Sequence, residues 1–465
     1  MEIAILIGSF TIVCLLGMPV AYALGLAAIL AALWVGIPLE AVMLKVSGGM
    51  SGFSLLAIPF FILAGAIMAV GGMAERLVNL AKVFVGFIRG GMALVNILAS
   101  TMFGCISGSS VADTAAVGSV MIPQMIKNGY PRLFAVNVTI SGSLQPLLVP
   151  PSHNMIIYSV AAGGTISVAH LFMGGIIPAL LLGLSLIILV LIIAHRNNFP
   201  KGEVVPLRKA LKIALDAVWG MITIAIIGWV KPGFLPAGRP TPWNERLAAL
   251  KDIWAPLLLF IFVIGGLYGL PFLPRFTPTE AGGVGASGAF LIGVLSGRLN
   301  KDGILTSLLQ ATRTAAAVFT VLIGALLFGY FLTITQTPQK VTEFLTALGL
   351  GKYGVLALIM VMYLLLGCLM DAMAMIILTI PIIFPVITHL GFDPIWFGVI
   401  IVMTVELGLI HPPVGMNVFV IKSVIKDVSF TTIFKGVIPF IITDLIRLVI
   451  LIAFPILALW LPSRM

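Results

Sequence analysis

Long apolar segments that carry almost no charge are the feature that most restricts this chain of 465 residues. About 20 such residues span a bilayer as a helix, because a helix satisfies its own backbone hydrogen bonds in hydrocarbon. The chain is 60% hydrophobic and 9% charged, whereas a soluble domain carries about 25% charged residues. The sequence therefore predicts an all-α polytopic membrane protein, with a length that allows roughly ten to twelve crossings.

The apolar segments give a coarse map of the expected helices. They lie at 2–34 (one long helix, or two broken near Pro19), 53–74, 91–126, 132–150, 168–194, 254–274, 281–297, 312–335, 354–388, 394–411 and 432–461. Two of them, 91–126 and 354–388, are long enough for re-entrant helical hairpins that enter and leave the membrane on one side.

The net charge of +10 comes from basic residues in the loops between these segments. In a membrane protein such residues mark the cytoplasmic face, so we do not expect a nucleic-acid partner. By this rule the first hairpin opens to the cytoplasm and the second to the opposite side. The apolar core of 201–253 is short for a span and is flanked by basic residues. We therefore expect helices at 209–230 and 244–253 that lie along the cytoplasmic interface.

Two distant stretches of the chain match each other. FGCIS at 103–107 resembles LGCLM at 366–370, GYP at 129–131 matches GFDP at 391–394, and PPSHN at 150–154 matches PPVGMN at 412–417. Three matches in the same order at nearly equal spacing indicate two copies of one unit. With opposite orientations they form an inverted repeat, in which secondary transporters build a binding site near the bilayer midplane.

A polar break, SGSSVADT at 107–114, interrupts the first hairpin. Unwound carbonyls and hydroxyls there suit a small cation, and helix N-termini present amides to an anion. The Pro-Pro pairs at 150–151 and 412–413 interrupt the following helices beside the hairpin tips. The alternative for the polar break is a small-residue face for helix packing.

Acidic residues inside apolar segments are costly and are functional by default. Asp371 is expected to be functional for this reason. For Asp113 two interpretations stay open, a ligand or a hairpin N-cap and hydrogen-bond partner. For Glu406 two interpretations also stay open, a functional role or pairing with a neighbouring helix.

Other ionisable residues are expected to be structural. His153 and His411, next to the Pro-Pro pairs, are interpreted as packing histidines, with a proton relay as the alternative. Asp444 and Arg447 have the i, i+3 spacing of an ion pair. Glu280 follows a Pro-set turn and is expected to be an acid at a helix N-terminus.

Five motifs together resemble the large membrane subunit (M) of tripartite ATP-independent periplasmic (TRAP) transporters. They are 104–123 (GCISGSSVADTAAVGSVMIP), 150–152 (PPS), 276–281 (FTPTEA), 367–381 with Asp371, and 411–415 (HPPVG). The resemblance implies a sodium-coupled importer of small organic anions that works by an elevator motion in the bacterial inner membrane. It also implies two partners, a periplasmic substrate-binding protein (P) and a small four-helix membrane subunit (Q).

The resemblance and the repeat together give three expected sets of site residues. A first Na+ site comprises Ser107, Gly108, Ser109, Ser152 and Asn154. A second comprises Gly367, Asp371, Pro413, Gly415 and Asn417. The substrate set comprises Ser110, Asp113, Thr114 and Ala372. Na+ is the co-transported ion, and no organic cofactor is expected.

The same interpretation divides the chain into a transport part and a scaffold. The expected division is N-terminal scaffold helices (1–90), a first transport half (91–165, hairpin 91–126 and broken helix 132–165), a scaffold helix (166–200), a cytoplasmic interfacial arm segment (201–253), scaffold helices (254–311), a second transport half (312–431, with helix 312–335, hairpin 354–388 and broken helix 394–425) and a C-terminal helix (432–465).

Two other classes of membrane protein fit the sequence less well than a transporter. A membrane-embedded enzyme needs a catalytic set such as Ser-Lys or His-Asp, which no motif supplies, so the chain is not expected to be an enzyme. A channel predicts a continuous polar stripe, whereas polar residues here concentrate at two points. Proton coupling in the same fold stays open as the alternative to sodium. Dicarboxylates, keto acids, sugar acids and sialic acid all remain possible substrates.

Overall fold

The computed structural model describes residues 2–200 and 274–464, apart from 72, 87, 296, 298, 368, 369, 371, 413, 414, 426 and 427, together with positions 259, 262, 263 and 265–267. Within these residues the regular structure is helical, with no β-strand. The expected interfacial helices at 209–230 and 244–253 lie outside the described residues, as does most of the expected span at 254–274.

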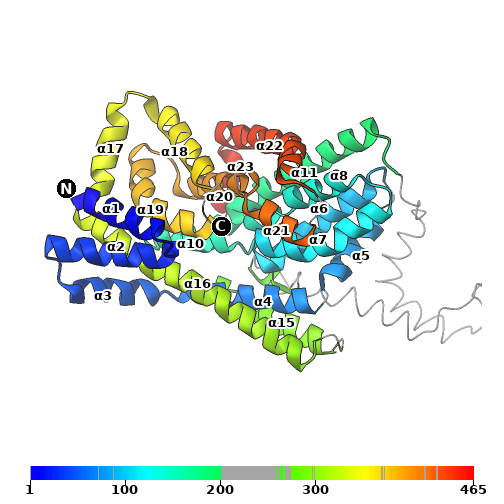
Figure 1. Ribbon diagram of the computed structural model, residues 1–465, viewed down its shortest axis with the longest axis horizontal. Helices are drawn as coiled ribbons and strands as arrows, with labels where there is room; N and C mark the ends of the chain where they lie inside the picture. The colour runs from blue at the N-terminus through cyan, green and yellow to red at the C-terminus, as the bar shows by residue number, and fades with distance from the viewer. Residues whose placement is uncertain are drawn as a thin grey trace, which may run out of the picture.

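One group of helices packs around the long helix α16 (Figure 1). Its members are α1 (Glu2–Leu15), α2 (Val20–Val35), α3 (Leu39–Met50), α4 (Ala57–Val70), α15 (Pro278–Leu295) and α16 (Lys301–Ile334). Small residues on α2, such as Ala27 and Ala31, let it pack closely on Phe331 of α16 in a separate hydrophobic cluster. The first apolar segment is thus two helices broken before Pro19, one of the two expected forms.

The two expected hairpins are present. The first is α6 (Gly91–Ser107) followed by α7 (Ser110–Lys127), and the second is α18 (Gly351–Gly367) followed by α19 (Ala372–His389). The helices that lead into them, α5 (Met73–Val85) and α17 (Thr337–Ala347), were not expected from the apolar segments. They lie apart along the long axis of the molecule (Figure 1).

Each hairpin is followed by a helix that is broken at a Pro-Pro pair. The first consists of α8 (Arg132–Gly142), α9 (Gln145–Leu148) and α10 (His153–Ala161), and the second of α20 (Pro394–Ile410) and α21 (Met416–Val424). The first bends by 48° at its break. Beyond the breaks the two copies exchange partners, since α10 packs on α19 and α21 packs on α7. The two matching stretches therefore meet around a shared centre.

Three further helices complete the described fold. They are α11 (Val168–Arg196), α22 (Phe430–Ala453) and α23 (Ile456–Leu459). Both α11 and α22 pack against helices of the two repeats and against each other. At the centre lies α20, which is buried along its whole length from Trp396 to Ile410.

Four described helices are long and apolar enough to cross a membrane alone, α11, α16, α19 and α22, and the bent pair of α8–α9 with α10 makes a fifth. This is fewer than the roughly ten to twelve crossings that the length allows. The difference arises because Pro and Gly divide many apolar segments into shorter helices, such as α4 and α20.

Candidate ion and solute site

The tip of the first hairpin turns within two residues. Gly108 takes the left-handed conformation (φ 58°) that ends α6, and its N–H donates to the carbonyl of Gly104 at 2.9 Å. Ser109 then caps α7, because its Oγ accepts a hydrogen bond from the Ala112 N–H at 3.3 Å. The tip therefore presents the C-terminal end of α6 and the N-terminal end of α7 at the same place.

The first broken helix has a matching turn. The peptide bond between Pro150 and Pro151 is cis. Ser152 then caps α10, its Oγ accepting from the Met155 N–H at 3.4 Å. Ser152 and Asn154 are both buried, and within the described residues neither amide atom of Asn154 has a hydrogen-bond partner.

The hairpin tip lies directly against this break. A Cβ atom at Gly108 would stand 2.6 Å from the carbonyl oxygen of Pro151 and 3.4 Å from Nδ1 of His153. The structure thus brings Gly108 and Ser109 beside Ser152, as expected for the first ion site. Ser107 is the last residue of α6, and only its backbone is described.

The second copy shows a close approach at Gly367, which corresponds to Gly104 in the first hairpin, where an added Cβ atom would stand 2.7 Å from Pro146. A Cβ atom at Gly367, the last residue of α18, would stand 2.8 Å from Cα of Gly408 in α20. Gly415 (φ 59°) ends the break before α21, and Ala372 begins α19. Asp371 and Pro413, both expected in the second ion site, lie outside the described residues.

A buried hydrogen-bond network joins the two copies. Nδ2 of Asn417, in α21, donates to Oγ of Ser110 in α7 and to Oγ of Ser143 at 3.2 Å. Thr114 Oγ1 donates to the same Ser143 oxygen at 2.6 Å. The network unites one residue expected for an ion, Asn417, with two expected for the substrate, Ser110 and Thr114.

Ser143, just after α8, was missed by the sequence analysis although it connects this network. Its signal is the SGS stretch at 141–143, a polar and small-residue interruption close to the Pro-Pro pair. Such an interruption weakens the end of α8, close to the hairpin tip.

The other ionisable residues are placed as follows. Arg447 Nη1 lies 2.9 Å from Asp444 Oδ1, which confirms the expected ion pair. Glu406 is buried within electrostatic range of both, which favours pairing with a neighbouring helix over a site role. His153 packs beside Phe61, with 6.3 Å between ring centroids.

Glu280 forms the expected structure at a helix N-terminus. Its Oε2 accepts from the N–H and the hydroxyl of Thr277 at 2.8 and 2.9 Å, while its own N–H donates to Thr277 Oγ1 at 3.3 Å. This reciprocal arrangement is a capping box for α15.

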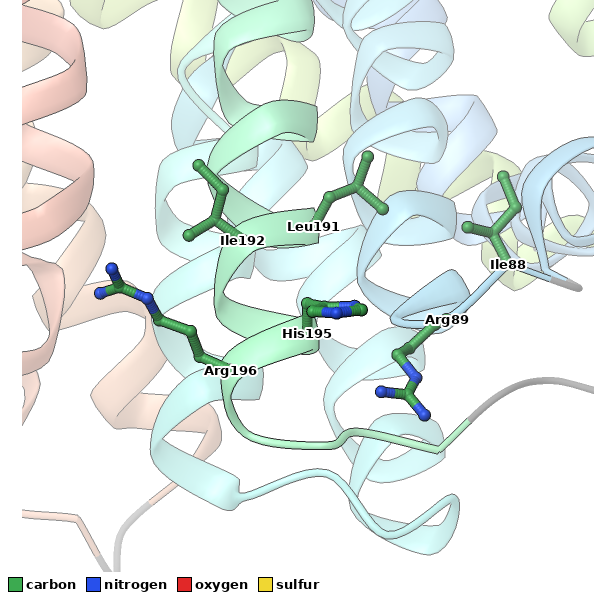
Figure 2. Close-up of a pocket in the computed structure, with 6 residues that line it drawn as sticks. All are labelled: Ile88, Arg89, Leu191, Ile192, His195 and Arg196. Carbon is green, nitrogen blue, oxygen red and sulfur yellow. The ribbon is translucent and has the colours of Figure 1, made fainter.

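Two hollows open on the described part of the molecule, and none of the expected site residues lines either. The larger, of about 910 Å³, lies between α3 and the helices α10 and α19, beside the place where α16 packs on α19, and Lys45, Ser159 and Thr333 are among its lining residues. The smaller, of about 490 Å³, lies at the end of α11, where Figure 2 shows His195 and Arg196 on α11 and Arg89 across from them. The side chains of Ser110, Ser152, Asn154 and Asn417 in the candidate site are all buried.

A cation in this site would be held by oxygen atoms. Within the described ranges no three His, Cys, Asp or Glu side chains gather as a metal cluster. The site instead offers hydroxyls, backbone carbonyls at helix ends and the amide of Asn154. Such hard, uncharged oxygen ligands suit an alkali or alkaline-earth cation better than a transition metal.

Residues 7–457 match the family described as "Tripartite ATP-independent periplasmic transporter, DctM component". The chain belongs to this family. It is 34% identical to the C4-dicarboxylate TRAP transporter large permease protein DctM of Vibrio cholerae, over 97% of this chain and 95% of that protein. It is 31% identical to the sialic acid TRAP transporter large permease protein SiaM of Vibrio cholerae, over 90% of this chain and 88% of that protein. The resemblance seen in the motifs is therefore confirmed.

A solved structure shares the fold of this family member. The crystal structure of the Alcanivorax borkumensis YdaH transporter matches with a TM-score of 0.59 and 15% identity, covering 91% of this chain and 88% of that one. Together with the helical architecture, these relationships make the chain an integral multi-pass membrane protein of a transporter family rather than an enzyme.

Proposed function

We propose that this chain is the large permease subunit of a secondary active importer, which carries small organic anions across the bacterial inner membrane by sodium symport. Family membership supports the transporter class. Relatives are named for C4-dicarboxylates, sialic acid and 2,3-diketo-L-gulonate, all small organic acids. The single observation that carries the proposal is the buried network of Asn417, Ser110, Ser143 and Thr114, where both repeats meet.

The proposed ion sites lie on the two sides of this network. The first uses the hairpin tip and the break that it contacts, with Ser107, Gly108, Ser109, Ser152 and Asn154 as the ligand set. The second uses the corresponding tip and break, with Gly367, Asp371, Pro413, Gly415 and Asn417. Hydroxyl and carbonyl oxygens at helix ends replace part of the hydration shell of Na+.

The solute is proposed to bind next to these ions through Ser110, Thr114 and Ala372. Hydroxyl groups and backbone N–H groups at the starts of α7 and α19 are proposed to donate to a carboxylate. Sodium bound nearby offsets the negative charge of the solute, so that each increases the affinity for the other. This mutual dependence is what couples an anion to a cation gradient.

The proposed motion is an elevator, in which the hairpins and broken helices slide against a scaffold. Two features support it. The cluster of α1, α2 and the C-terminal part of α16 is separate from the main hydrophobic core, and the hollow of about 910 Å³ lies between α3 and the helices α10 and α19. Because α16 packs along α2 and α4 and also on α19, the segment 312–335, which the sequence assigns to the second transport half, is proposed to lie at the boundary between the two parts.

Two partners complete the proposed machine. A periplasmic substrate-binding protein delivers the solute, and a small four-helix membrane subunit supports the scaffold. The names of the relatives, which are large permease proteins of TRAP transporters, support this composition.

Uptake of a radiolabelled organic acid into proteoliposomes tests the proposal. The vesicles contain this chain with its small membrane subunit, and the binding protein is added outside. We expect uptake with an inward Na+ gradient and background uptake when K+ replaces Na+. Unchanged uptake without the Na+ gradient contradicts sodium coupling, and uptake that follows a pH gradient instead favours protons.

Two serine variants test the site itself. Ser110→Ala removes the hydroxyl that accepts from Asn417, whereas Ser119→Ala removes an exposed hydroxyl from the same helix. We expect Ser110→Ala to lower uptake at limiting solute about 5- to 30-fold, as loss of a buried hydrogen bond of about 1–2 kcal/mol predicts. Ser119→Ala is expected to behave as the wild type, and equal uptake by both variants contradicts the assigned site.

A further inference from the structure

Asp113 is a buried carboxylate in the first turn of α7. Its side chain is 0% exposed, and within the described residues neither carboxylate oxygen has a hydrogen-bond partner. An ionised carboxylate in such a position is strongly unfavourable unless a cation or a proton accompanies it. The charge of Asp113 therefore requires a partner that the network around Asn417 does not provide.

The role of N-cap does not explain this residue. The hydroxyl of Ser109 already accepts the Ala112 N–H that an N-cap satisfies, and Asp113 is the fourth residue of the helix. A carboxylate is also unsuited to contact an organic anion, because two negative charges in a low dielectric repel each other strongly. We therefore separate Asp113 from the proposed substrate set.

One further polar group lies beside Asp113 on the neighbouring helix of the hairpin. The hydroxyl of Ser100, on α6, lies beside the carboxyl group and is itself buried with no other partner among the described residues. A hydroxyl and a carboxylate that lack other partners in the described part of the chain thus lie next to each other between α6 and α7.

Within the described residues, no permanent positive charge supplies the missing partner. The helices α4, α6 and α9, which pack on α7, contain no Asp, Glu, His, Lys or Arg. Apart from Asp113, the charged residues of α7, α8 and α21 are Lys127, Arg132 and Lys422, which lie at or near the helix ends away from the tip. On α5, neither Glu75 nor Lys82 acts on Asp113 at short range.

The second repeat has no acid and no serine at the positions that correspond to Asp113 and Ser100. Gly104 and Gly367, Pro131 and Pro394, and Asn154 and Asn417 are each 263 residues apart. By the same offset Asp113 corresponds to Ile376 and Ser100 to Tyr363, both fully buried. The fold itself therefore does not require an acid at this position.

We propose that Asp113 and Ser100 form a third cation site, inside the first hairpin and separate from the two sites at the hairpin tips. Its ligand is a monovalent cation, either Na+ held by the carboxylate and the hydroxyl or a proton held by the carboxylate. The proposal concerns cation binding by this chain alone and does not depend on which solute is carried. Release of this cation to the cytoplasm then moves one positive charge in addition to the Na+ ions released from the two sites at the hairpin tips.

Cation binding by the full-length chain in lipid nanodiscs tests this site without solute or binding protein. The number of bound Na+ ions is measured by ²²Na+ equilibrium binding, with choline keeping the ionic strength constant. Asp113→Asn removes the charge with almost no change in shape. Asp302→Asn makes the same change at an exposed position in the first turn of α16 and serves as the control.

If the ligand is Na+, we expect Asp113→Asn to bind one ion fewer than the wild type and Asp302→Asn. If the ligand is a proton, the Na+ count is unchanged and the pH dependence of the Tm differs. An acid that stays protonated in the fold binds more protons than in the unfolded chain, so stability falls as pH rises. Asp113→Asn is then expected to lose this fall. An unchanged Na+ count together with an unchanged pH dependence overturns the proposal.

A second variant keeps the proposal testable if Asp113→Asn does not fold. Ser100→Ala retains the carboxylate and removes only the hydroxyl beside it. For a sodium site we expect the Na+ dissociation constant of the third ion to rise about 2- to 10-fold, as for the loss of one hydroxyl contact. For a proton site we expect a shift in the pH profile of the Tm. Ser119→Ala is the control, and a Ser100→Ala protein that matches it in both measurements contradicts the site.

Discussion

The side-chain amide of Asn417 donates to Ser110 and thereby joins the second broken helix to the first hairpin. Asn417→Ala leaves the buried Ser110 and Ser143 hydroxyls without this donor, which costs about 1–3 kcal/mol. We expect a lower Tm and a raised KM for solute uptake. Thermal unfolding in nanodiscs and uptake kinetics check both effects.

An exposed asparagine provides the control for this change. The side chain of Asn128 donates only to the carbonyl of Gln124 at the end of α7. Asn128→Ala is expected to leave KM unchanged. If the two variants have the same KM, Asn417 is not part of the solute or ion site.

Much of this site could be predicted from the sequence because its residues interrupt apolar helices. Backbone groups at a break in hydrocarbon must be satisfied by protein or ligand, so the break at 107–114 and the Pro-Pro pairs revealed the hairpin tips. The repeat then predicted that the two copies meet, and the contacts of α7 with α21 and of α10 with α19 confirm it.

Other features could not be read from local pattern. The amphipathic helices α5 and α17 carry enough polar residues to resemble loops, and they become helical by packing on the hairpins. The link between Ser143 and Asn417 spans 274 positions. Only the rotation of α8 and α21 about their axes decides which of their polar residues face each other.

Gly108 is predicted to be required at the first hairpin tip for two reasons. Its φ of 58° disfavours any side chain, and an added Cβ would lie 2.6 Å from the Pro151 carbonyl oxygen. Gly108→Ala is therefore expected to displace the tip from the break and to weaken Na+ binding by more than about tenfold, which corresponds to 1.4 kcal/mol. Equilibrium Na+ binding measures this change.

A substitution at Gly163 distinguishes the effect of backbone strain from the effect of contact between the hairpin tip and the break. It also has a positive φ, 87°, but an added Cβ would meet nothing within 4 Å. Gly163→Ala is expected to cost about 1–2 kcal/mol of stability without affecting Na+ affinity. Equal losses of Na+ affinity in both variants would mean that backbone strain, rather than contact between tip and break, explains the effect.

The close crossing of α18 and α20 makes a further prediction. Gly367 and Gly408 approach so closely that a Cβ on either would stand less than 3 Å from the backbone of the other. Gly408→Ala is expected to force the helices apart and to destabilise the protein by about 1–3 kcal/mol. Gly283→Ala, in α15, adds a methyl group where nothing lies within 4 Å and is expected to be neutral or slightly stabilising. A Tm for Gly408→Ala equal to that of Gly283→Ala contradicts the crossing.

The ion pair of Asp444 and Arg447 offers the last prediction, because Glu406 lies near it in the same buried region. Asp444 pairs with the guanidinium, Glu406 lies within its electrostatic range, and Arg447 is only 3% exposed. Arg447→Met leaves the buried acids without a cation, so we expect a loss of about 3–5 kcal/mol. Adding Glu406→Gln and Asp444→Asn to Arg447→Met removes the uncompensated charges and is expected to recover most of the Tm. Arg313→Met, on an exposed face of α16, is expected to have little effect. If the triple variant is no more stable than Arg447→Met alone, the three side chains do not act as one charge cluster.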